Sequence, residues 1–227
     1  MRFVFLSHKL DPADVAWPGE PVLSLTITSC IGQQDSPFNA VISHLPNHFG
    51  THCDGPRHFC PNGPALHQLP IDYFAYQQDE ILLIAVPKGP RAIVTREDIA
   101  PYAPQLQDKK LLLIRTGFEA YRQRDPEIYS KEGPCLHPDL CRYLVEHFPR
   151  LLCIGMDFLS IGSPCNDLGV EAHRWLLGYY GEKFIIAIED MTLAPLQDQL
   201  PQLLTLGPSR IVGADSGQVS VMAGLAP

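Results

Sequence analysis

Clustered basic residues and long hydrophobic segments are both missing from this sequence. Lys and Arg make up 17 of the 227 residues, against 25 Asp and Glu, and the formal net charge is -8. Because a surface that binds nucleic acid normally carries a clustered basic face, this balance argues against a nucleic-acid partner. The longest apolar runs, such as residues 81–86, fall far short of the roughly 20 residues that a membrane-spanning helix needs. No membrane segment is predicted.

Paired-cysteine motifs are missing as well. The seven cysteines are scattered and odd in number, and no CxxC pair occurs among them. This pattern is typical of reduced thiols in the cytosol rather than of a disulfide framework. The chain also starts with only a short apolar run before Ser7, too short for the apolar core of a signal peptide. We therefore expect a cytoplasmic location.

A linker of biased composition, an internal repeat and a low-complexity tract are absent too. The 22 prolines and 17 glycines are spread along the whole length of the chain. With 45% hydrophobic and 19% charged residues, the chain can bury a substantial core. We expect one compact domain, rich in turns, over residues 1–227.

Strand patterns recur along the chain. Between residues 23 and 28, Leu and Ile alternate with Ser and Thr, the period-two pattern of a strand with one buried face. Five apolar runs are typical of strands that are covered on both faces. These runs are residues 2–6, 81–86, 111–115, 151–156 and 184–188.

Helix patterns are fewer. Thr95 followed by Asp98 resembles the capping box that opens a short helix. Apolar residues keep helical spacing across residues 139–148 (DLCRYLVEHF), with Pro138 just ahead as a start signal. Residues 171–181 (EAHRWLLGYYG) are a second candidate, which the glycines near its end would terminate. Many strands, few helices and no regular βαβ repeat predict a mixed α/β fold.

One segment, HFGTHCDGPRHF, holds three histidines and an aspartate within twelve residues. His48, His52, Asp54 and His58 all occupy even positions, so an extended chain would project them to one side. Gly50 would then leave an empty slot on that side, where an ion or a substrate could sit. A sustained helix is disfavoured by the glycines and the proline of the segment.

The spacing adds a condition to this extended arrangement. His52 and Asp54 would be about 6.6 Å apart along a strand, close enough to share one ion. His48 and His52 would be about 13 Å apart, near the limit for two imidazoles that hold one metal. We therefore expect the chain to bend at Gly50, since glycine tolerates backbone angles that other residues avoid.

A nitrogen and oxygen donor set of this kind suits Zn²⁺ or Mn²⁺ better than Ca²⁺. The alternative, that the histidines only form hydrogen bonds within a polar loop, is weaker for four such residues than for one. A second ion would need further carboxylates or imidazoles from elsewhere in the chain. The second half offers five candidates, among which the residues alone do not choose: Asp157, His173, Glu182, Glu189 and Asp190.

The histidine segment matches every fixed position of the pattern HxGTHxDxPxHF, and so resembles the cyclase-like metal-dependent hydrolases. This family contains bacterial kynurenine formamidase and isatin hydrolase. Weaker similarity to its members extends over most of the chain. It comprises WPGE from Trp17, GMDFLSIG from Gly155, AHRWLL with the later IIAIEDMTL, and RIVGADSG near the C-terminus.

The resemblance implies a swivelling β/β/α-type single domain with a mixed sheet, assembled as a homodimer or larger. It also implies two divalent ions, with Zn²⁺ as the first choice and Mn²⁺ as the alternative. His48, His52 and Asp54 would hold the first ion, and His173 and Glu189 the second, with both carboxylates bridging. His58 would be the general acid/base, and Trp17 would pack against an aromatic substrate. Glu182 is the alternative to Glu189.

The implied activity is hydrolysis of a carbon–nitrogen amide bond, in a formamide or cyclic amide, by a water that the ions activate. The small, aromatic substrate would resemble that of kynurenine formamidase. Glu20 stands where formamidases usually have Asp, and residues 178–184 look like an insertion that we expect at the pocket rim. Three alternatives stay open: an isatin-hydrolase-like lactam or ester hydrolase, a non-catalytic metal-binding scaffold, and a metal-free domain that binds a small aromatic ligand.

Overall fold

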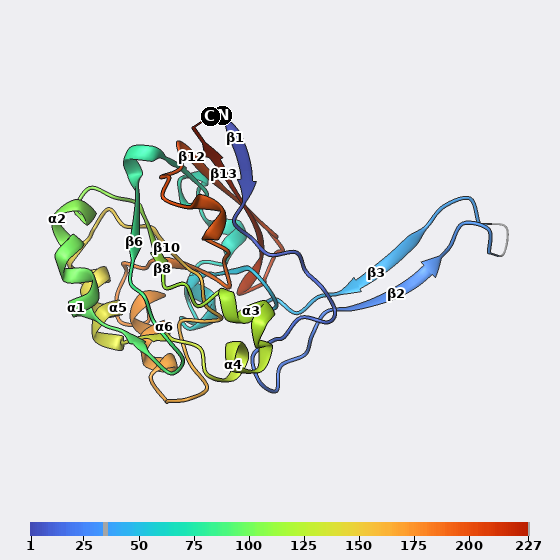
Figure 1. The fold of residues 1–227 in the computed structure, drawn as a ribbon, viewed down its shortest axis with the longest axis horizontal. Helices are drawn as coiled ribbons and strands as arrows, with labels where there is room; N and C mark the ends of the chain where they lie inside the picture. The colour runs from blue at the N-terminus through green and yellow to red at the C-terminus, as the bar shows by residue number, and fades with distance from the viewer. Residues whose placement is uncertain (34–35, 227) are drawn as a thin grey trace.

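The computed structural model describes residues 1–33 and 36–226 (Figure 1). The strands are β1 (Arg2–Phe5), β2 (Ser24–Ser29), β3 (Ala40–His44), β4 (His52–Asp54), β5 (Ala75–Gln77), β6 (Ile81–Ala85), β7 (Ile93–Val94), β8 (Leu111–Arg115), β9 (Cys135–Leu136), β10 (Cys153–Met156), β11 (Ile186–Glu189), β12 (Leu203–Pro208) and β13 (Ser216–Leu225). The α-helices are α1 (Arg96–Ile99), α2 (Ala103–Leu106), α3 (Ala120–Arg124), α4 (Pro126–Lys131), α5 (Pro138–His147) and α6 (Gly169–Leu176). Short 3-10 helices are η1 (Pro56–His58), η2 (Leu66–Gln68), η3 (Ile71–Tyr73), η4 (Gln78–Glu80), η5 (Ala100–Tyr102) and η6 (Ala194–Leu196).

A nine-stranded mixed sheet organises the fold. Eight strands follow the order β5-β12-β13-β4-β11-β10-β8-β6, and β1 pairs with β13. The four strands β6, β8, β10 and β11 are mutually parallel, and the remaining pairs in this sheet are antiparallel. The predicted mixed α/β fold is confirmed. Strand β1 and strand β13 are antiparallel partners, so the two chain ends lie side by side (Figure 1).

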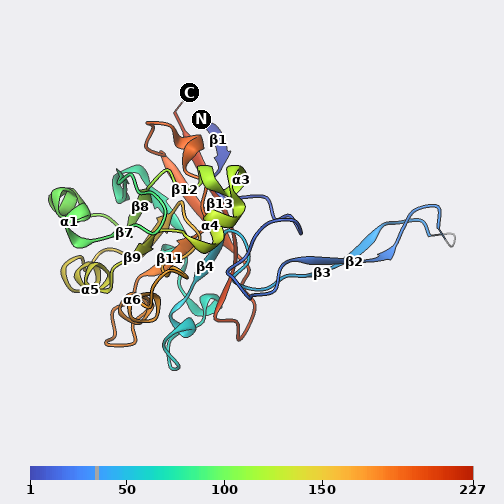
Figure 2. The same cartoon turned by 60° about the horizontal axis from the view of Figure 1, so that its bottom comes forward.

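The core has two apolar clusters, one on each face of the central strands. Along β8, Leu112 and Ile114 join the cluster that the helices cover, whereas Leu111 and Leu113 join the cluster on the other face. Alternate side chains of a strand point to opposite faces, so a strand covered on both sides must be apolar throughout. This explains why residues 111–115 read as an apolar run without alternation. Figure 2 shows α5 and α6 together on one side of the sheet.

Most of the predicted elements are confirmed. The runs at residues 81–86, 111–115, 151–156 and 184–188 form β6, β8, β10 and β11. Helix α1 begins after Thr95, whose backbone N–H donates to Asp98 at 2.8 Å. Helices α5 and α6 cover most of their predicted ranges, and α6 ends two residues before Gly178, which takes the left-handed conformation that glycine tolerates.

Two predictions about burial are wrong. Strand β1 forms, but Phe3 and Phe5 are 67% and 64% exposed, because β1 lies at an edge and pairs only with β13 among the described residues. Strand β2 also forms, yet Leu25 and Ile27, which were expected inside, are 52% and 71% exposed. The alternation predicts the strand correctly, but the described residues place nothing over its apolar face.

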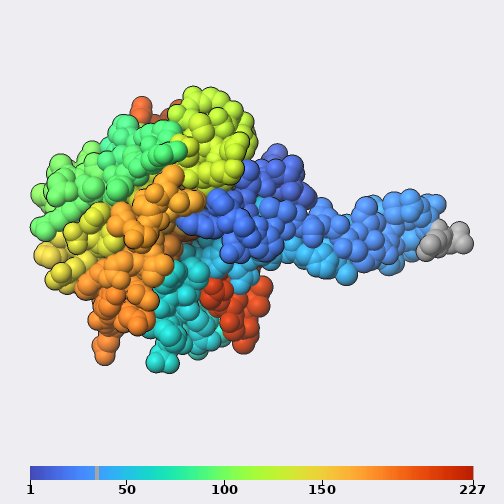
Figure 3. Space-filling model, turned by 90° about the horizontal axis from the view of Figure 1, so that it is seen from below, coloured from blue at the N-terminus to red at the C-terminus, as the bar shows by residue number. Residues whose placement is uncertain are grey.

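The cause is the position of the β2–β3 hairpin, which we call the arm (β2 Ser24–Ser29 and β3 Ala40–His44). Its two strands pair only with each other among the described residues, and the arm projects away from the body of the molecule (Figures 1 and 3). No helix within the described residues is long and apolar enough to cross a membrane.

Candidate metal centre

Strand β4 carries the middle of the histidine segment into the centre of the sheet. It lies between β11 and β13, where Glu189 pairs with His52 and Ser216 pairs with Asp54. Residues that face each other across neighbouring strands project to the same side of a sheet. The register therefore places Glu189 on the same side as His52 and Asp54, although Glu189 is far away in the sequence.

The predicted bend at Gly50 is confirmed by its φ of +67°. It brings the His48 ring within 5.1 Å of the His52 ring, measured between centroids. A single extended segment is not what forms, because β4 has only three residues and His58 lies in the 3-10 helix η1. The slot at Gly50 is also not open, since a methyl group there would collide with the side chain of Leu10.

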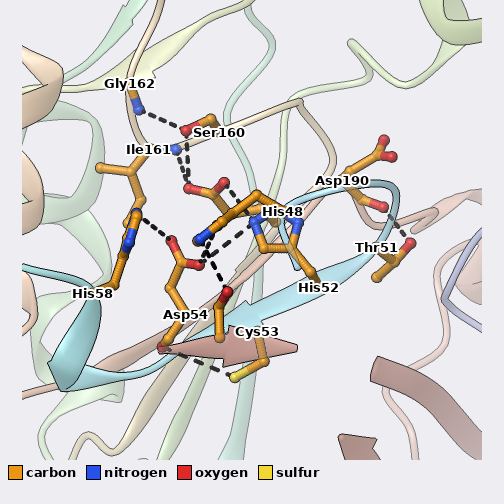
Figure 4. A network of polar contacts seen from close by, with 12 residues as sticks. His48, Thr51, His52, Cys53, Asp54, His58, Ser160, Ile161, Gly162 and Asp190 are labelled. Carbon is orange, nitrogen blue, oxygen red and sulfur yellow. Dashed lines mark hydrogen bonds and ion pairs between the residues drawn. The ribbon is translucent and has the colours of Figure 1, made fainter. Parts of the chain in front are cut away.

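The carboxylates of Asp54 and Glu189 each face imidazoles on two sides. Figure 4 shows Asp54 with His58 on one side and with His48 and His52 on the other. On the first side, Asp54 Oδ1 lies 3.1 Å from His48 Nδ1 and 3.5 Å from His52 Nε2. Glu189 Oε2 lies 3.3 Å from the same His52 nitrogen. These atoms form a compact group of nitrogen and oxygen donors.

The second side uses the other oxygen of each carboxylate. Asp54 Oδ2 lies 3.8 Å from His173 Nε2 and 4.0 Å from His58 Nε2. Glu189 Oε1 lies 3.6 Å from His173 Nε2. The structure thus brings together all six of the metal-ligand and acid/base residues that the sequence suggests.

These residues fit a divalent ion. Both carboxylate oxygens of Asp54 and Nε2 of His52 are buried and have no hydrogen-bond partner among the described residues. Burying such polar atoms without compensation is costly, especially for a charged carboxylate. Two sets of donor atoms lie within 4.8 Å of one another, namely His48, Asp54 and His58, and His52, Asp54 and Glu189. A cation between them would satisfy the orphaned atoms.

The charges at the centre are strongly coupled. Burial lowers the pKa of His48, but the hydrogen bond to Asp215 and the nearby charge of Asp54 outweigh it and raise the pKa to about 10. Burial raises the pKa of Glu189, but the neighbouring imidazoles of His173 and His52 outweigh it and hold the pKa well below its usual range. The buried imidazoles and carboxylates therefore each favour the charged form of the other in the metal-free protein.

Backbone and hydroxyl groups hold the donors in place. His52 Nδ1 and His173 Nδ1 donate to the carbonyls of Gly50 (2.8 Å) and Gly169 (2.6 Å). Because a carbonyl can only accept, each neutral ring keeps its Nε2 lone pair for the centre. Glu189 Oε1 accepts from Ser160 Oγ at 3.0 Å and from the Ile161 N–H at 2.6 Å.

Asp215 is a member of this cluster that the sequence did not single out. Its Oδ2 lies 2.9 Å from His48 Nε2 and 3.0 Å from His58 Nδ1. Asp215 directly precedes β13, whose pairing with β4 carries it to the histidines. The only sequence signal was its place in RIVGADSG, a segment noted for family resemblance and not for chemistry.

The other candidates from the second half lie elsewhere. Asp157 accepts hydrogen bonds from Thr116 and from the Gly117 N–H. Asp190 binds Arg122 and the Tyr129 hydroxyl. Glu182 is an exposed residue of the loop between α6 and β11, outside the cluster.

A cavity of about 410 Å³ opens beside the clustered residues. Trp17, Glu20 and Phe59 line it, and the Phe59 ring stacks on His173 with centroids 4.5 Å apart. Residues 178–184 are not among the lining residues, so the expectation that this segment shapes the pocket rim is wrong. A hollow of about 570 Å³ between α1 and α5 is lined by other residues and holds none of the clustered donors.

The family model "Cyclase", described as "Putative cyclase", matches residues 4–163 of the chain. The chain belongs to the cyclase family. The predicted resemblance is confirmed, and the chain is an enzyme, a hydrolase of this family with residues that fit a divalent metal.

Relatives of this cyclase-family chain cover much or all of its length. An uncharacterized protein of Haemophilus influenzae is 41% identical over 135 residues, which are 60% of this chain and 90% of that protein. The kynurenine formamidase of Salinibacter ruber is 25% identical over 234 residues, covering 100% of this chain and 99% of that enzyme. Isatin hydrolase A from Labrenzia aggregata, solved with benzyl benzoate, shares the fold with a TM-score of 0.78 and 20% identity. The match covers 98% of this chain and 93% of that structure.

Proposed function

We propose that this chain hydrolyses a carbon–nitrogen amide bond, in a formamide or cyclic amide, of a small aromatic substrate. The observation that carries the proposal is the pair of buried carboxylates, Asp54 and Glu189. Each directs one oxygen toward His52 and the other oxygen toward His173. Two-metal hydrolytic sites hold their ions about 3.5–4 Å apart, a separation that a carboxylate can span with one oxygen on each ion. The similarity to the kynurenine formamidase of Salinibacter ruber supports the choice of bond.

We propose two ions for each chain. His48, His52 and Asp54 would hold the first, and His173 and Glu189 would hold the second, with both carboxylates shared. Imidazole and carboxylate donors suit Zn²⁺, with Mn²⁺ as the alternative. The bound ions would supply an acidified water and polarise the carbonyl of the substrate.

The side chains around the ions have separate tasks in this proposal. His58 directs Nε2 toward the centre. It would take the proton that the attacking water releases and pass it to the leaving nitrogen of the substrate, the usual task of a general acid/base. Trp17 and Phe59 form aromatic walls of the cavity and would pack against the substrate ring. Ser160 and the Ile161 N–H would keep Glu189 in position.

The direct test is hydrolysis of N-formylkynurenine by protein reconstituted with zinc, with a chelated sample beside it. We expect turnover of about 1–10³ per second, typical of enzymes on their own substrates, and its loss on chelation. If metal binds but N-formylkynurenine is inert, isatin-like lactams and aryl esters are tested next. Metal-loaded protein that cleaves none of these would contradict the proposal and favour a non-catalytic scaffold.

We also propose that residues 1–227 form one domain. The first strand pairs with the last, and both apolar clusters share the same central strands. The second cluster contains residues from Leu6 to Leu225, so a division of the chain anywhere between them would separate its members.

The arm supports a further proposal, that the protein is a homodimer. Ile27 pairs with Val41 across the ribbon, so both lie on one face together with Leu25, and all three are exposed. Residues 22–44 contain no Lys, Arg or Glu. A lone two-stranded hairpin is marginal in water, and uncharged free edges are the type that pair with another chain.

A second copy of the chain is the partner that we propose for the arm. The body carries another exposed apolar patch on the edge strand and its neighbour, formed by Met1, Phe3, Phe5 and Met222. In a two-fold dimer each arm could cover the patch of the other subunit, so that one symmetric exchange buries both surfaces.

Replacing Ile27 by Asp should convert the dimer into monomers. The side chain is exposed within one chain, so folding should be unaffected, but two apolar contacts worth about 2 kcal/mol each would be lost. The dissociation constant should rise at least about 10³-fold, which sedimentation velocity would measure. The control is Ile71→Asp, an exposed site away from the arm and the patch. A wild-type monomer, or an unchanged dimer in the Ile27 variant, would contradict the proposal.

A further inference from the structure

A single carboxylate oxygen lies between two histidines of the centre. Asp215 Oδ2 is 2.9 Å from His48 Nε2 and 3.0 Å from His58 Nδ1. The two rings are stacked at a tilt, with centroids 4.2 Å apart. The other oxygen of Asp215 accepts from Asn47 Nδ2 at 3.1 Å, which fixes the rotation of the carboxylate.

With ions between the donors of the centre, this arrangement determines where each neutral ring carries its hydrogen. A carboxylate only accepts hydrogen bonds, so both nitrogens that face Asp215 must be N–H groups. A neutral imidazole has one N–H, which leaves lone pairs on His48 Nδ1 and on His58 Nε2. These are the two nitrogens that point to Asp54, at 3.1 Å and 4.0 Å from its oxygens.

The other neighbour of His48 Nε2 does not decide this question. Ser216 Oγ lies 3.0 Å from His48 Nε2, but a hydroxyl can either donate or accept. Of the two groups at His48 Nε2, only the carboxylate of Asp215 imposes a direction on the hydrogen bond. The structural contribution of Asp215 is separate, because its backbone carbonyl accepts from the Gly55 N–H at 3.2 Å. A change of the side chain can therefore leave the connection between β13 and the histidine segment intact.

We propose that Asp215 is a positioning residue that sets the tautomers of His48 and His58 together. The same oxygen would turn the Nδ1 lone pair of His48 to an ion and the Nε2 lone pair of His58 to the reacting water. This inference rests on the proposed function, because it assigns the acid/base group and a ligand to one common partner.

The first test reads the tautomers directly and needs no substrate. Long-range ¹H–¹⁵N correlation spectra of the zinc-loaded protein, with histidines labelled, distinguish Nδ1–H from Nε2–H rings. We expect His58 as the Nδ1–H form in the wild type. In Asp215→Asn, whose amide can donate to the ring, that signal should be lost or mixed with the other form. A wild-type His58 in the Nε2–H form would overturn the proposal.

The second test separates positioning from folding. In Asp215→Asn we expect kcat to fall by up to about 10²–10⁴-fold, the usual contribution of a general acid/base, because His58 would lose its orientation. KM should change less than about threefold, because Asp215 is not among the residues that line the cavity. Asp215→Glu, which restores a carboxylate, should recover part of kcat, and Asp72→Asn, an exposed aspartate on η3, should match the wild type.

The outcomes keep the two proposals apart. A normal kcat in Asp215→Asn, or an equal loss in Asp215→Glu with unchanged tautomers, would overturn the role of Asp215. If the wild type hydrolyses no amide, lactam or ester, the proposed function fails, while the spectra still decide whether Asp215 sets the tautomers.

Discussion

Replacing His58 by Ala should leave the metal content of the protein unchanged and reduce turnover by about 10²–10⁴-fold, the usual contribution of a general acid/base. The nitrogen of His58 that faces the centre is 4.0 Å from Asp54, farther than those of His48 and His52 from the same carboxylate. Its other nitrogen is engaged by Asp215. His58 is therefore placed to move a proton, and the ions keep their other donors.

The measurement pairs the metal content of the purified variant, by mass spectrometry, with kcat on the substrate found for the wild type. His147→Ala is the control, because His147 is exposed and lies outside the centre. If His58→Ala loses an ion together with its activity, His58 belongs to the ligand set. The grouping of His48, Asp54 and His58 within 4.8 Å would then describe a true metal site.

Removing the metal should abolish turnover and lower the stability of the fold. Without a cation, the buried oxygens of Asp54 have no hydrogen-bond partner among the described residues. Zinc at 100 to 1,000 times its dissociation constant should add about 3–4 kcal/mol to the free energy of unfolding, if only the folded chain binds it. Thermal or urea unfolding of chelated and reconstituted samples measures this difference.

The stabilisation should also depend on pH in a defined direction. The pKa of His48 is raised to about 10, so at neutral pH an ion must displace a proton from this ring. Raising the pH removes the competing proton, and the apparent affinity should increase about tenfold per unit below pH 10 for each proton released. Chelator competition between pH 6 and pH 9 gives the slope. In Asp54→Asn the stabilisation by zinc should largely disappear, and an unchanged effect there would contradict the assignment of Asp54.

The histidine segment was the part of the site that the sequence could predict. Its donors lie within eleven residues of one another, so local spacing and one glycine bend bring them close. Glu189 was harder, because Glu182 is nearly as well placed in the sequence. The register of β11 against β4 separates the two, and that register is set by the burial of the strands and not by any local motif.

Two other features depend on contacts that no short pattern contains. Asp215 reaches His58 across 157 residues, through the pairing of β13 with β4. The slot at Gly50 is filled by Leu10, which comes from a separate segment of the chain. The predicted burial of one face of the arm was wrong for another reason. Alternation identifies an apolar face that another surface should cover, but it does not say whether the same chain supplies that surface.

The insertion of β4 between β11 and β13 has a consequence for folding kinetics. The donors come from an early segment and from two late ones, so the centre is complete only after distant parts of the chain have paired. Folds dominated by such distant pairings form slowly, and interactions completed after the transition state mainly slow unfolding. Zinc should therefore extend the lifetime of the folded protein while leaving its rate of folding almost unchanged.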